Sequence, residues 1–397
     1  MRRLFKSLIS FFEFLVVIII IFIFGIVLIT AVDILELADI PEQYSLAKYL
    51  KSTTEIPINE NLNNQIDENT IINSIEKVEG EQQPQIDYTQ VPEGIESVYS
   101  ANDNTSTTSN NLVEKYYYSQ LNEYGKIFYD KMYLNKENLK NGNYIVDFDK
   151  QFNNIMQQEN GSAIVKNAFQ AGLNALMYDN PEFFYLDIAK MYLYTETTTI
   201  ILKKTYRIYI GPEEGKDYFA VGFNSRQDVE NAILQINQKI STINGINSGS
   251  DYTKIMAVHD YLIDNTSYDQ TISMNNIYNI YGTLINNVAV CEGYSKAFKY
   301  ILDYIGINNI IVSGIGVDND GKQESHAWNY VFLRGNWYAV DVTWDDPIIV
   351  GNGKLNSKYR YRYFLKGFEE FGRDHFEDGN IVENVQFSYP VLSNSNY

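Results

Sequence analysis

The sequence has very little cysteine and very little histidine. Its 397 residues include a single cysteine, Cys291, and three histidines. One cysteine cannot form a disulfide within the chain, so no disulfide framework supports the fold. The histidines, His259, His326 and His375, do not show the spacing of metal ligands, either with one another or with the cysteine. We therefore predict no metal site, and we expect no cofactor.

Basic residues are also scarce. The chain has 31 Lys and Arg against 50 Asp and Glu, a formal net charge of −19. Binding to nucleic-acid phosphates requires a cluster of basic side chains, and no such cluster occurs beyond the N-terminus. The composition therefore argues against a nucleic-acid partner. A hydrophobic content of 45% and an aromatic content of 14% fit a globular protein with a sizeable core.

Charge is absent from one long stretch near the N-terminus. Residues 14–32 are uncharged and mainly apolar, and Arg2, Arg3 and Lys6 precede them. At about 1.5 Å per residue, such a helix matches a bilayer core of about 30 Å. A cleaved signal peptide is the alternative, but its apolar region is usually about 7–15 residues long and ends at a small-residue site. We predict an uncleaved transmembrane anchor over residues 1–33, with the N-terminus in the cytoplasm and everything after it outside.

Composition then divides the rest of the chain. Residues 35–51 could form a short helix, and residues 52–111 are rich in Asn, Gln, Glu, Ser and Thr. We therefore expect a flexible extracytoplasmic stalk over residues 34–111, with partial order against the domain left open. Residues 112–224 show helical spacing over 114–132 and 152–177 and then Tyr-, Thr- and Ile-rich strands. We predict an accessory α+β region there and a separate catalytic domain over residues 225–397.

The C-terminal part is predicted to place helices before an antiparallel meander, which is an α+β pattern. Gly306 is expected to end the third helix. The predicted helices and strands cover, in order, residues 225–240, 251–264, 291–304, 309–316, 325–333 and 336–344.

Cys291 occupies a position that is hard to explain as structure alone. The run 288–298 indicates a strand or loop entering a helix, with Cys291 in the first helical turn. The positive end of the helix dipole favours a thiolate at such a position. A buried, inert cysteine is the alternative interpretation. Outside the cell an unpaired thiol is open to oxidation, so it is either buried or used.

His326 and Asp341 complete the set of groups that a sulfur nucleophile requires. An imidazole can take the thiol proton and pass it to a leaving group, and a carboxylate on its other nitrogen fixes its tautomer. If Arg334 and Gly335 form the centre of a two-residue turn, Asp341 lies opposite Trp328. His326 is then reached along a diagonal of about 7–8 Å on the same face. The hypothesis therefore demands one hairpin register.

Other residues near these three allow two interpretations each. His259 lies in an apolar helical pattern and is expected to be structural, whereas His375 is favoured as structural with a functional role left open. The three tryptophans, Trp328, Trp337 and Trp344, cluster around the predicted histidine and aspartate, either as sheet packing or as an apolar wall.

An oxyanion hole needs hydrogen-bond donors aimed at the developing charge. The backbone N–H of Cys291 is one candidate, and Tyr268 and Tyr281 are weak candidates for the second. Gly293 indicates a close approach of the backbone, either near the nucleophile or in tight helix packing.

At these motifs the chain resembles the transglutaminase-like superfamily, which has a papain-like core. The likeness extends from about residue 116 onward and is strongest over 251–347. A further stretch, 363–375, resembles the tail of bacterial members, which suggests a bacterial, membrane-anchored member. The matching pieces are residues 290–298, 314–316, 326–329 and 337–347.

The resemblance implies a papain-like or transglutaminase-like α+β fold, with a catalytic cysteine at a helix N-terminus packed on an antiparallel sheet. It implies Cys291 as nucleophile, His326 as base and Asp341 as the group that orients the base. The expected function is an extracytoplasmic cysteine acyltransferase that uses a thioester to form amide cross-links or attach amines to protein or peptide substrates at the cell surface. A cysteine peptidase or amidase acting on envelope peptides, and a non-enzymatic interaction module, are the alternatives. Calcium control is not implied.

Overall fold

The computed structural model describes residues 51–54, 78–79, 115–200, 203–346, 349–350, 357–382 and 385–397. Within these ranges no helix combines the length and the apolar character that crossing a membrane requires. The predicted anchor lies outside the described residues. So does the predicted stalk, apart from two short strands, β1 (Lys51–Thr54) and β2 (Val78–Glu79).

The predicted accessory region begins with helices. The helical spacing over 114–132 predicts one helix, but the structure has two, because the chain turns after Ser119 and Asn122 starts the next helix by accepting a hydrogen bond from the Gly125 N–H. The elements are α2 (Tyr116–Ser119), α3 (Glu123–Leu134), α4 (Lys136–Leu139), α5 (Asn153–Met156), α6 (Gly161–Asp179) and the 3₁₀ helix η4 (Pro181–Phe183).

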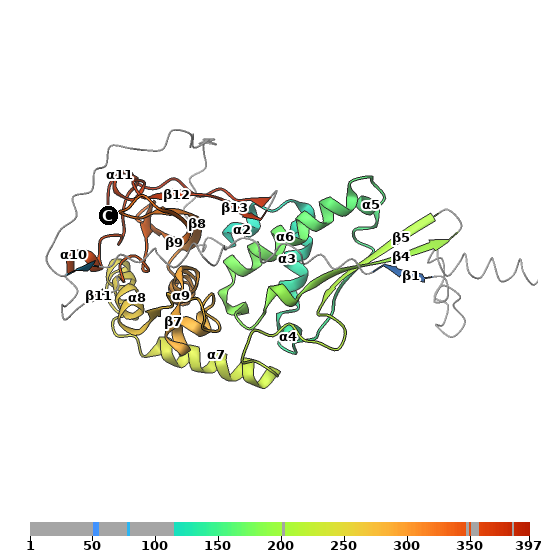
Figure 1. The fold of residues 1–397 in the computed structure, drawn as a ribbon, viewed down its shortest axis with the longest axis horizontal. Coiled ribbons are helices and arrows are strands. Elements are labelled where there is room, and N and C mark those ends of the chain that lie inside the picture. Colours follow the sequence, from blue (N-terminus) through green and yellow to red (C-terminus); the bar gives the residue numbers. More distant parts are fainter. Residues whose placement is uncertain are drawn as a thin grey trace, which may run out of the picture.

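A four-stranded antiparallel sheet follows, in the order β1-β4-β5-β3. Its centre is the hairpin of β4 (Tyr192–Ile200) and β5 (Lys203–Gly211), which confirms the strands predicted there. Strand β3 (Val146–Asp149) pairs with β5, and the 3₁₀ helix η5 (Ile188–Lys190) leads into β4. The hairpin projects away from the helices (Figure 1).

The predicted helices of the C-terminal part are all present. Ser225 starts the first by accepting a hydrogen bond from the Asp228 N–H, and Gly306, at φ +74°, follows the last. They are α7 (Arg226–Ser241), α8 (Asp251–Asn265) and α9 (Cys291–Tyr304), with a π-helical turn η6 (Gly282–Asn286) and the short parallel strands β6 (Ser267–Tyr268) and β7 (Val288–Ala289) between α8 and α9.

A second antiparallel sheet has the order β10-β9-β8-β12. Arg334 and Gly335, at φ 47° and 85°, form the two-residue turn, so the predicted hairpin register is confirmed. The last strand of this hairpin ends at Val340 rather than at residue 344, because the next residues turn around the Asp341 carboxylate. The strands are β8 (Asn309–Val317), β9 (Gln323–Leu333), β10 (Asn336–Val340) and β12 (His375–Glu377).

The remaining elements are short. Strand β11 pairs in parallel with β2, and β13 pairs with β14. Their bounds, with those of two single-turn helices, are β11 (Ile349–Val350), α10 (Ser357–Arg360), α11 (Phe368–Phe371), β13 (Asn380–Val382) and β14 (Val385–Gln386).

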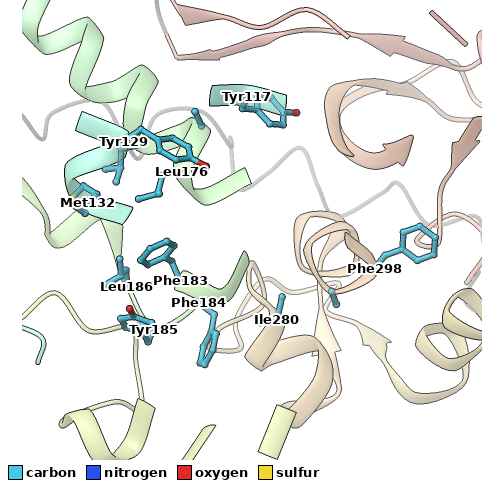
Figure 2. Close-up of a cluster of buried hydrophobic side chains, with 14 of the residues drawn as sticks. Tyr117, Tyr129, Met132, Leu176, Phe183, Phe184, Tyr185, Leu186, Ile280 and Phe298 are labelled. Atoms are coloured by element: carbon cyan, nitrogen blue, oxygen red, sulfur yellow. The ribbon is translucent and has the colours of Figure 1, made fainter. Parts of the chain in front are cut away.

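One hydrophobic cluster joins the two parts of the chain. Figure 2 shows Phe183 and Phe184, from η4 and the residue after it, in the same cluster as Ile280 and Phe298 from the C-terminal part. Helix α9 packs on the second sheet, where the Asn329 side chain donates to the Ser295 carbonyl at 3.0 Å. The fold is therefore α+β with a helix-on-sheet core, as predicted. The division into domains at residue 224 stays a prediction, since buried side chains are continuous across it.

Candidate active site

Cys291 is the first residue of α9, as predicted. Val290 before it is extended (φ −108°, ψ 179°), and no side chain caps the helix start. The Cys291 N–H therefore lacks an intrahelical partner, as do the other N–H groups of the first turn. Helix α9 approaches its neighbours closely because Gly293 has no side chain: a Cβ there would lie 2.3 Å from the Ile277 carbonyl oxygen.

The Cys291 residue is 6% exposed. Burial alone would suit the inert interpretation, so the polar groups beside the sulfur decide between the two. His326 is such a group, because Cys291 lies close enough to be among the causes that raise the pKa of His326. Among the described residues, His326 Nδ1 has no hydrogen-bond partner. That nitrogen is therefore available to the sulfur or to a substrate.

His326 and Asp341 are joined directly. His326 Nε2 lies 2.7 Å from Asp341 Oδ2, and both side chains are about 1% exposed. The contact arises from the confirmed register: Val340 pairs with Asn329, which places Asp341 opposite Trp328 and one diagonal from His326. The structure thus brings together all three residues that the sequence selected.

The two groups change each other's protonation. Burial alone would lower the pKa of His326, but the Asp341 carboxylate, followed by Cys291, raises it well above its usual value. Burial alone would raise the pKa of Asp341, but the charge of His326, and then hydrogen bonds from His326 and His375, hold it well below its usual range. The proton between the ring and the carboxylate therefore stays on the imidazole.

Asp341 is held by four donors. Its Oδ1 accepts hydrogen bonds from the backbone N–H groups of Thr343 (2.9 Å) and Trp344 (3.2 Å). Its Oδ2 accepts from His326, and also lies 3.1 Å from His375 Nε2. The carboxylate is fully buried, so these contacts fix its position without competition from water.

His375 was the least certain histidine in the sequence, and the structure places it beside Asp341. It opens β12 and pairs with Gly316 of β8, while its Nδ1 lies 2.7 Å from Asp374 Oδ1. Sequence reasoning missed this contact because His375 lies 34 residues from Asp341. The adjacent acid, Asp374, was the available signal, since an imidazole between carboxylates is usually oriented for a purpose.

Two of the three tryptophans line the histidine. The Trp344 ring stacks on His326 with centroids 5.1 Å apart, and the Trp328 ring lies at 5.9 Å. Trp337 instead packs against Phe332 at 5.2 Å, on the neighbouring strand. The apolar wall is therefore formed by two tryptophans, whereas Trp337 follows the other interpretation, packing on the sheet.

His259 has the structural position expected of it. It is fully buried, with Nε2 lying 3.0 Å from Asp345 Oδ2 and Nδ1 lying 3.2 Å from Asp260 Oδ1. Asp345 also accepts the Tyr363 N–H at 2.8 Å. This pair anchors α8 to the turn that follows Asp341.

The two tyrosines predicted as candidate oxyanion-hole donors, Tyr281 and Tyr268, lie in different surroundings. Tyr281 stacks on Phe184 with centroids 6.1 Å apart and meets Phe223 edge-on at 5.1 Å, so its ring belongs to the hydrophobic packing. Tyr268 lies on β6, paired with Ala289 two residues before the thiol. Tyr268 and the Cys291 N–H remain the predicted donors.

Sequence spacing gave no metal site, but the fold does assemble a group of metal-binding side-chain types. One donor atom from each of His326, Asp341 and His375 lies within 4.8 Å of the others. The described contacts among them are hydrogen bonds that converge on one oxygen, Asp341 Oδ2. The absence of a metal site therefore stays a prediction.

Known proteins support this region as a domain. Residues 240–342 match the family model of the Transglutaminase-like superfamily. Kyphoscoliosis peptidase of Mus musculus is 31% identical over 112 residues, which cover 26% of this chain and 16% of that protein. The Lim and transglutaminase domain protein ltd-1 of Caenorhabditis elegans is 27% identical over 103 residues, covering 21% and 14%. The chain therefore spans less than a fifth of the length of either relative.

A solved structure described as a TGase is 17% identical, with a TM-score of 0.27, and covers 45% of this chain and 50% of that one. The matched family residues include α9 and the hairpin that carries His326 and Asp341. Residues 240–342 are thus a domain of the transglutaminase-like superfamily, whose fold supports cysteine-dependent enzymes.

Proposed function

We propose that this protein is an extracytoplasmic cysteine acyltransferase with Cys291 as nucleophile, His326 as general base and Asp341 as the residue that orients His326. The observation that carries the proposal is the 2.7 Å contact between His326 and Asp341 next to the start of α9, where the only cysteine lies. Its substrates would be proteins or peptides at the cell surface.

The first half-reaction forms a thioester. The Cys291 thiol gives its proton to His326, and the sulfur forms a bond to the carbonyl carbon of a side-chain carboxamide, such as that of glutamine. The carbon–nitrogen bond breaks, and the leaving nitrogen takes the proton from His326 and departs as ammonia. Asp341 keeps the ring in the required tautomer throughout.

The second half-reaction transfers the acyl group. A primary amine forms a new carbon–nitrogen bond while the carbon–sulfur bond breaks, and the amine proton passes through His326 to the sulfur. The net reaction converts a carboxamide and an amine into a substituted amide and ammonia. The enclosed site supports an amine over water as acceptor, because Trp344 and Trp328 cover His326 and the residue Cys291 is 6% exposed.

Hydrolysis is the second candidate, and a relative's name favours it. The mouse protein that is 31% identical over 112 residues is called a peptidase. The same three side chains would serve a peptidase or amidase, with water in place of the amine and a carboxylic acid as product.

The two candidates are separated by product analysis. The protein is incubated with dimethylated casein as acyl donor and dansyl-cadaverine as amine, and both amine incorporation and ammonia release are measured. Incorporation that matches ammonia release supports transfer, whereas ammonia release or peptide cleavage without incorporation supports hydrolysis. Cys291→Ala and Cys291→Ser should abolish either activity while the thermal unfolding midpoint changes little, and an active Cys291→Ala would remove the proposed nucleophile.

A non-enzymatic interaction module is tested separately. Because the chain has one cysteine, iodoacetamide can label a single site, and intact-mass measurement gives the rate. Rapid alkylation at neutral pH supports an activated thiol. A rate no faster than that of free cysteine, without turnover, supports the module.

Location forms part of the proposal. Arg2, Arg3 and Lys6 before the uncharged run 14–32 support a single-pass anchor with the N-terminus in the cytoplasm. The protein should stay with membranes after an alkaline wash, and a membrane-impermeant amine-reactive biotin should label it in intact cells. Labelling only after lysis would place the catalytic domain on the cytoplasmic side.

A further inference from the structure

A line of alternating acids and imidazoles leads away from the proposed base. Asp374 Oδ1 lies 2.7 Å from His375 Nδ1, His375 Nε2 lies 3.1 Å from Asp341 Oδ2, and that oxygen lies 2.7 Å from His326 Nε2. The Tyr363 hydroxyl donates to the far oxygen of Asp374 at 2.8 Å. His375 lies outside the family match, which ends at residue 342.

We propose that His375 is a positioning residue, which holds the Asp341 carboxylate against His326 and moderates its negative charge. The inference rests on the proposed function, because it concerns the orientation of the base. It assigns no chemical step to His375, which faces the carboxylate and not the sulfur.

Both ring nitrogens of His375 face carboxylate oxygens. A neutral imidazole has one N–H and can donate to only one of them, whereas an imidazolium can donate to both. Aromatic rings surround His375 on several sides, as a cation would favour: Phe371 at 4.0 Å, Trp344 at 4.4 Å, and Trp328 and Tyr363 at 5.1 Å between centroids. The geometry thus places a carboxylate oxygen at each ring nitrogen of His375 inside an aromatic enclosure.

A second proton on His375 would change what Asp341 does for His326. Asp341 then lies between two imidazoles, so its charge is shared and its attraction for the His326 proton is weakened. The other ionisable groups near His375 are Tyr363 and Glu324, the latter in register across Gly316. Removing the charge of His375 should therefore strengthen the hold of Asp341 on the His326 proton.

Two substitutions distinguish a hydrogen-bonding role of His375 from a role in packing alone. His375→Gln places an N–H donor near the Nε2 position and removes the charge, whereas His375→Phe keeps a ring for the aromatic contacts and removes the donor. Asp374→Asn changes the outer partner, does not touch Asp341, and tests the same idea if His375→Phe fails to fold.

The readout is the rate of Cys291 alkylation by iodoacetamide between pH 5 and pH 10, measured on the full chain with thermal unfolding as the folding control. This readout does not need turnover, so the absence of any acyl transfer by the wild type would count against the proposed function alone. We expect His375→Phe to lower the maximal rate about tenfold and His375→Gln to restore it to within about threefold of wild type.

We also expect the high-pH limb, where His326 loses its proton, to move upward in His375→Gln and Asp374→Asn. Profiles for all three variants that coincide with the wild type would overturn the proposal. So would equal losses in folded His375→Phe and His375→Gln, because His375 would then only fill space.

Discussion

The indole of Trp344 lies against the imidazole of His326, with centroids 5.1 Å apart and 28° between the ring planes. The stack exists because the facing residue of β8 is Gly316. A Cβ at that position would lie 2.7 Å from Trp344 Cζ2 and 3.4 Å from His326 Cβ. The absence of one side chain on a neighbouring strand therefore sets how the proposed base is covered.

Gly316→Ala should disturb this stack more than it disturbs the fold. The new methyl group must displace the indole or the imidazole, and small displacements of a base can lower rates by about 100-fold. We expect kcat/KM for amine incorporation to fall about 10- to 100-fold, with a loss of stability of about 1–3 kcal/mol. Gly211→Ala is the matched control, because its Cβ would meet only Ile145, at 3.3 Å. Equal effects in the two variants would contradict a specific role.

Asp341→Asn should be severe. The carboxylate accepts four hydrogen bonds on two oxygens, and an amide offers one oxygen and one NH₂ group that cannot accept. Either the imidazoles or the backbone N–H groups then face a donor. We expect kcat/KM to fall on the order of 10³- to 10⁴-fold. Asp320→Asn, at an exposed turn position, is the control, and a loss below tenfold in Asp341→Asn would show that the amide orients His326 adequately.

Glu324 should make stability depend on pH. It is 2% exposed, neither carboxylate oxygen has a described hydrogen-bond partner, and burial raises its pKa from 4.5 to about 7. At low pH the carboxyl group is protonated in both the folded and the unfolded state, so its raised pKa does not change the free energy of unfolding. As pH rises from about 4.5 to about 7, the carboxyl group ionises in the unfolded state but not in the folded state, so the free energy of unfolding falls. Above that range the loss of stability reaches about 3 kcal/mol.

Glu324→Gln removes this ionisation. Its free energy of unfolding in urea, relative to that of the wild type, should therefore be about 2 kcal/mol larger at pH 8 than at pH 5, which means a more stable variant at the higher pH. Glu214→Gln, at an exposed position, should show no such change. The same difference from wild type at both pH values would mean that Glu324 is hydrated or paired in solution.

His259 should matter for stability. His259→Phe leaves the buried Asp345 carboxylate without its imidazole, and breaking a buried pair in this way costs about 3–5 kcal/mol. Adding Asp345→Asn should recover part of the loss, with a coupling energy of at least about 1 kcal/mol in a double-mutant cycle of urea unfolding. Strictly additive losses would mean that the two side chains do not interact.

Local features of the site followed from neighbouring residues. The start of α9 at Cys291 and its end before Gly306 were predicted, because helix ends depend on a few adjacent residues. The hairpin register was predicted from Arg334-Gly335, since a two-residue turn fixes which residues of its strands face each other. That register was enough to bring Asp341 to His326.

The sequence by itself thus determined the helix that carries the cysteine and the hairpin that joins the histidine to the aspartate. The tertiary structure alone decided that β12 pairs with β8, which brings His375 to the same carboxylate oxygen, and that Trp344 rather than Trp337 covers His326. Pairing between strands distant in sequence depends on how whole faces pack, and no local pattern encodes the partner.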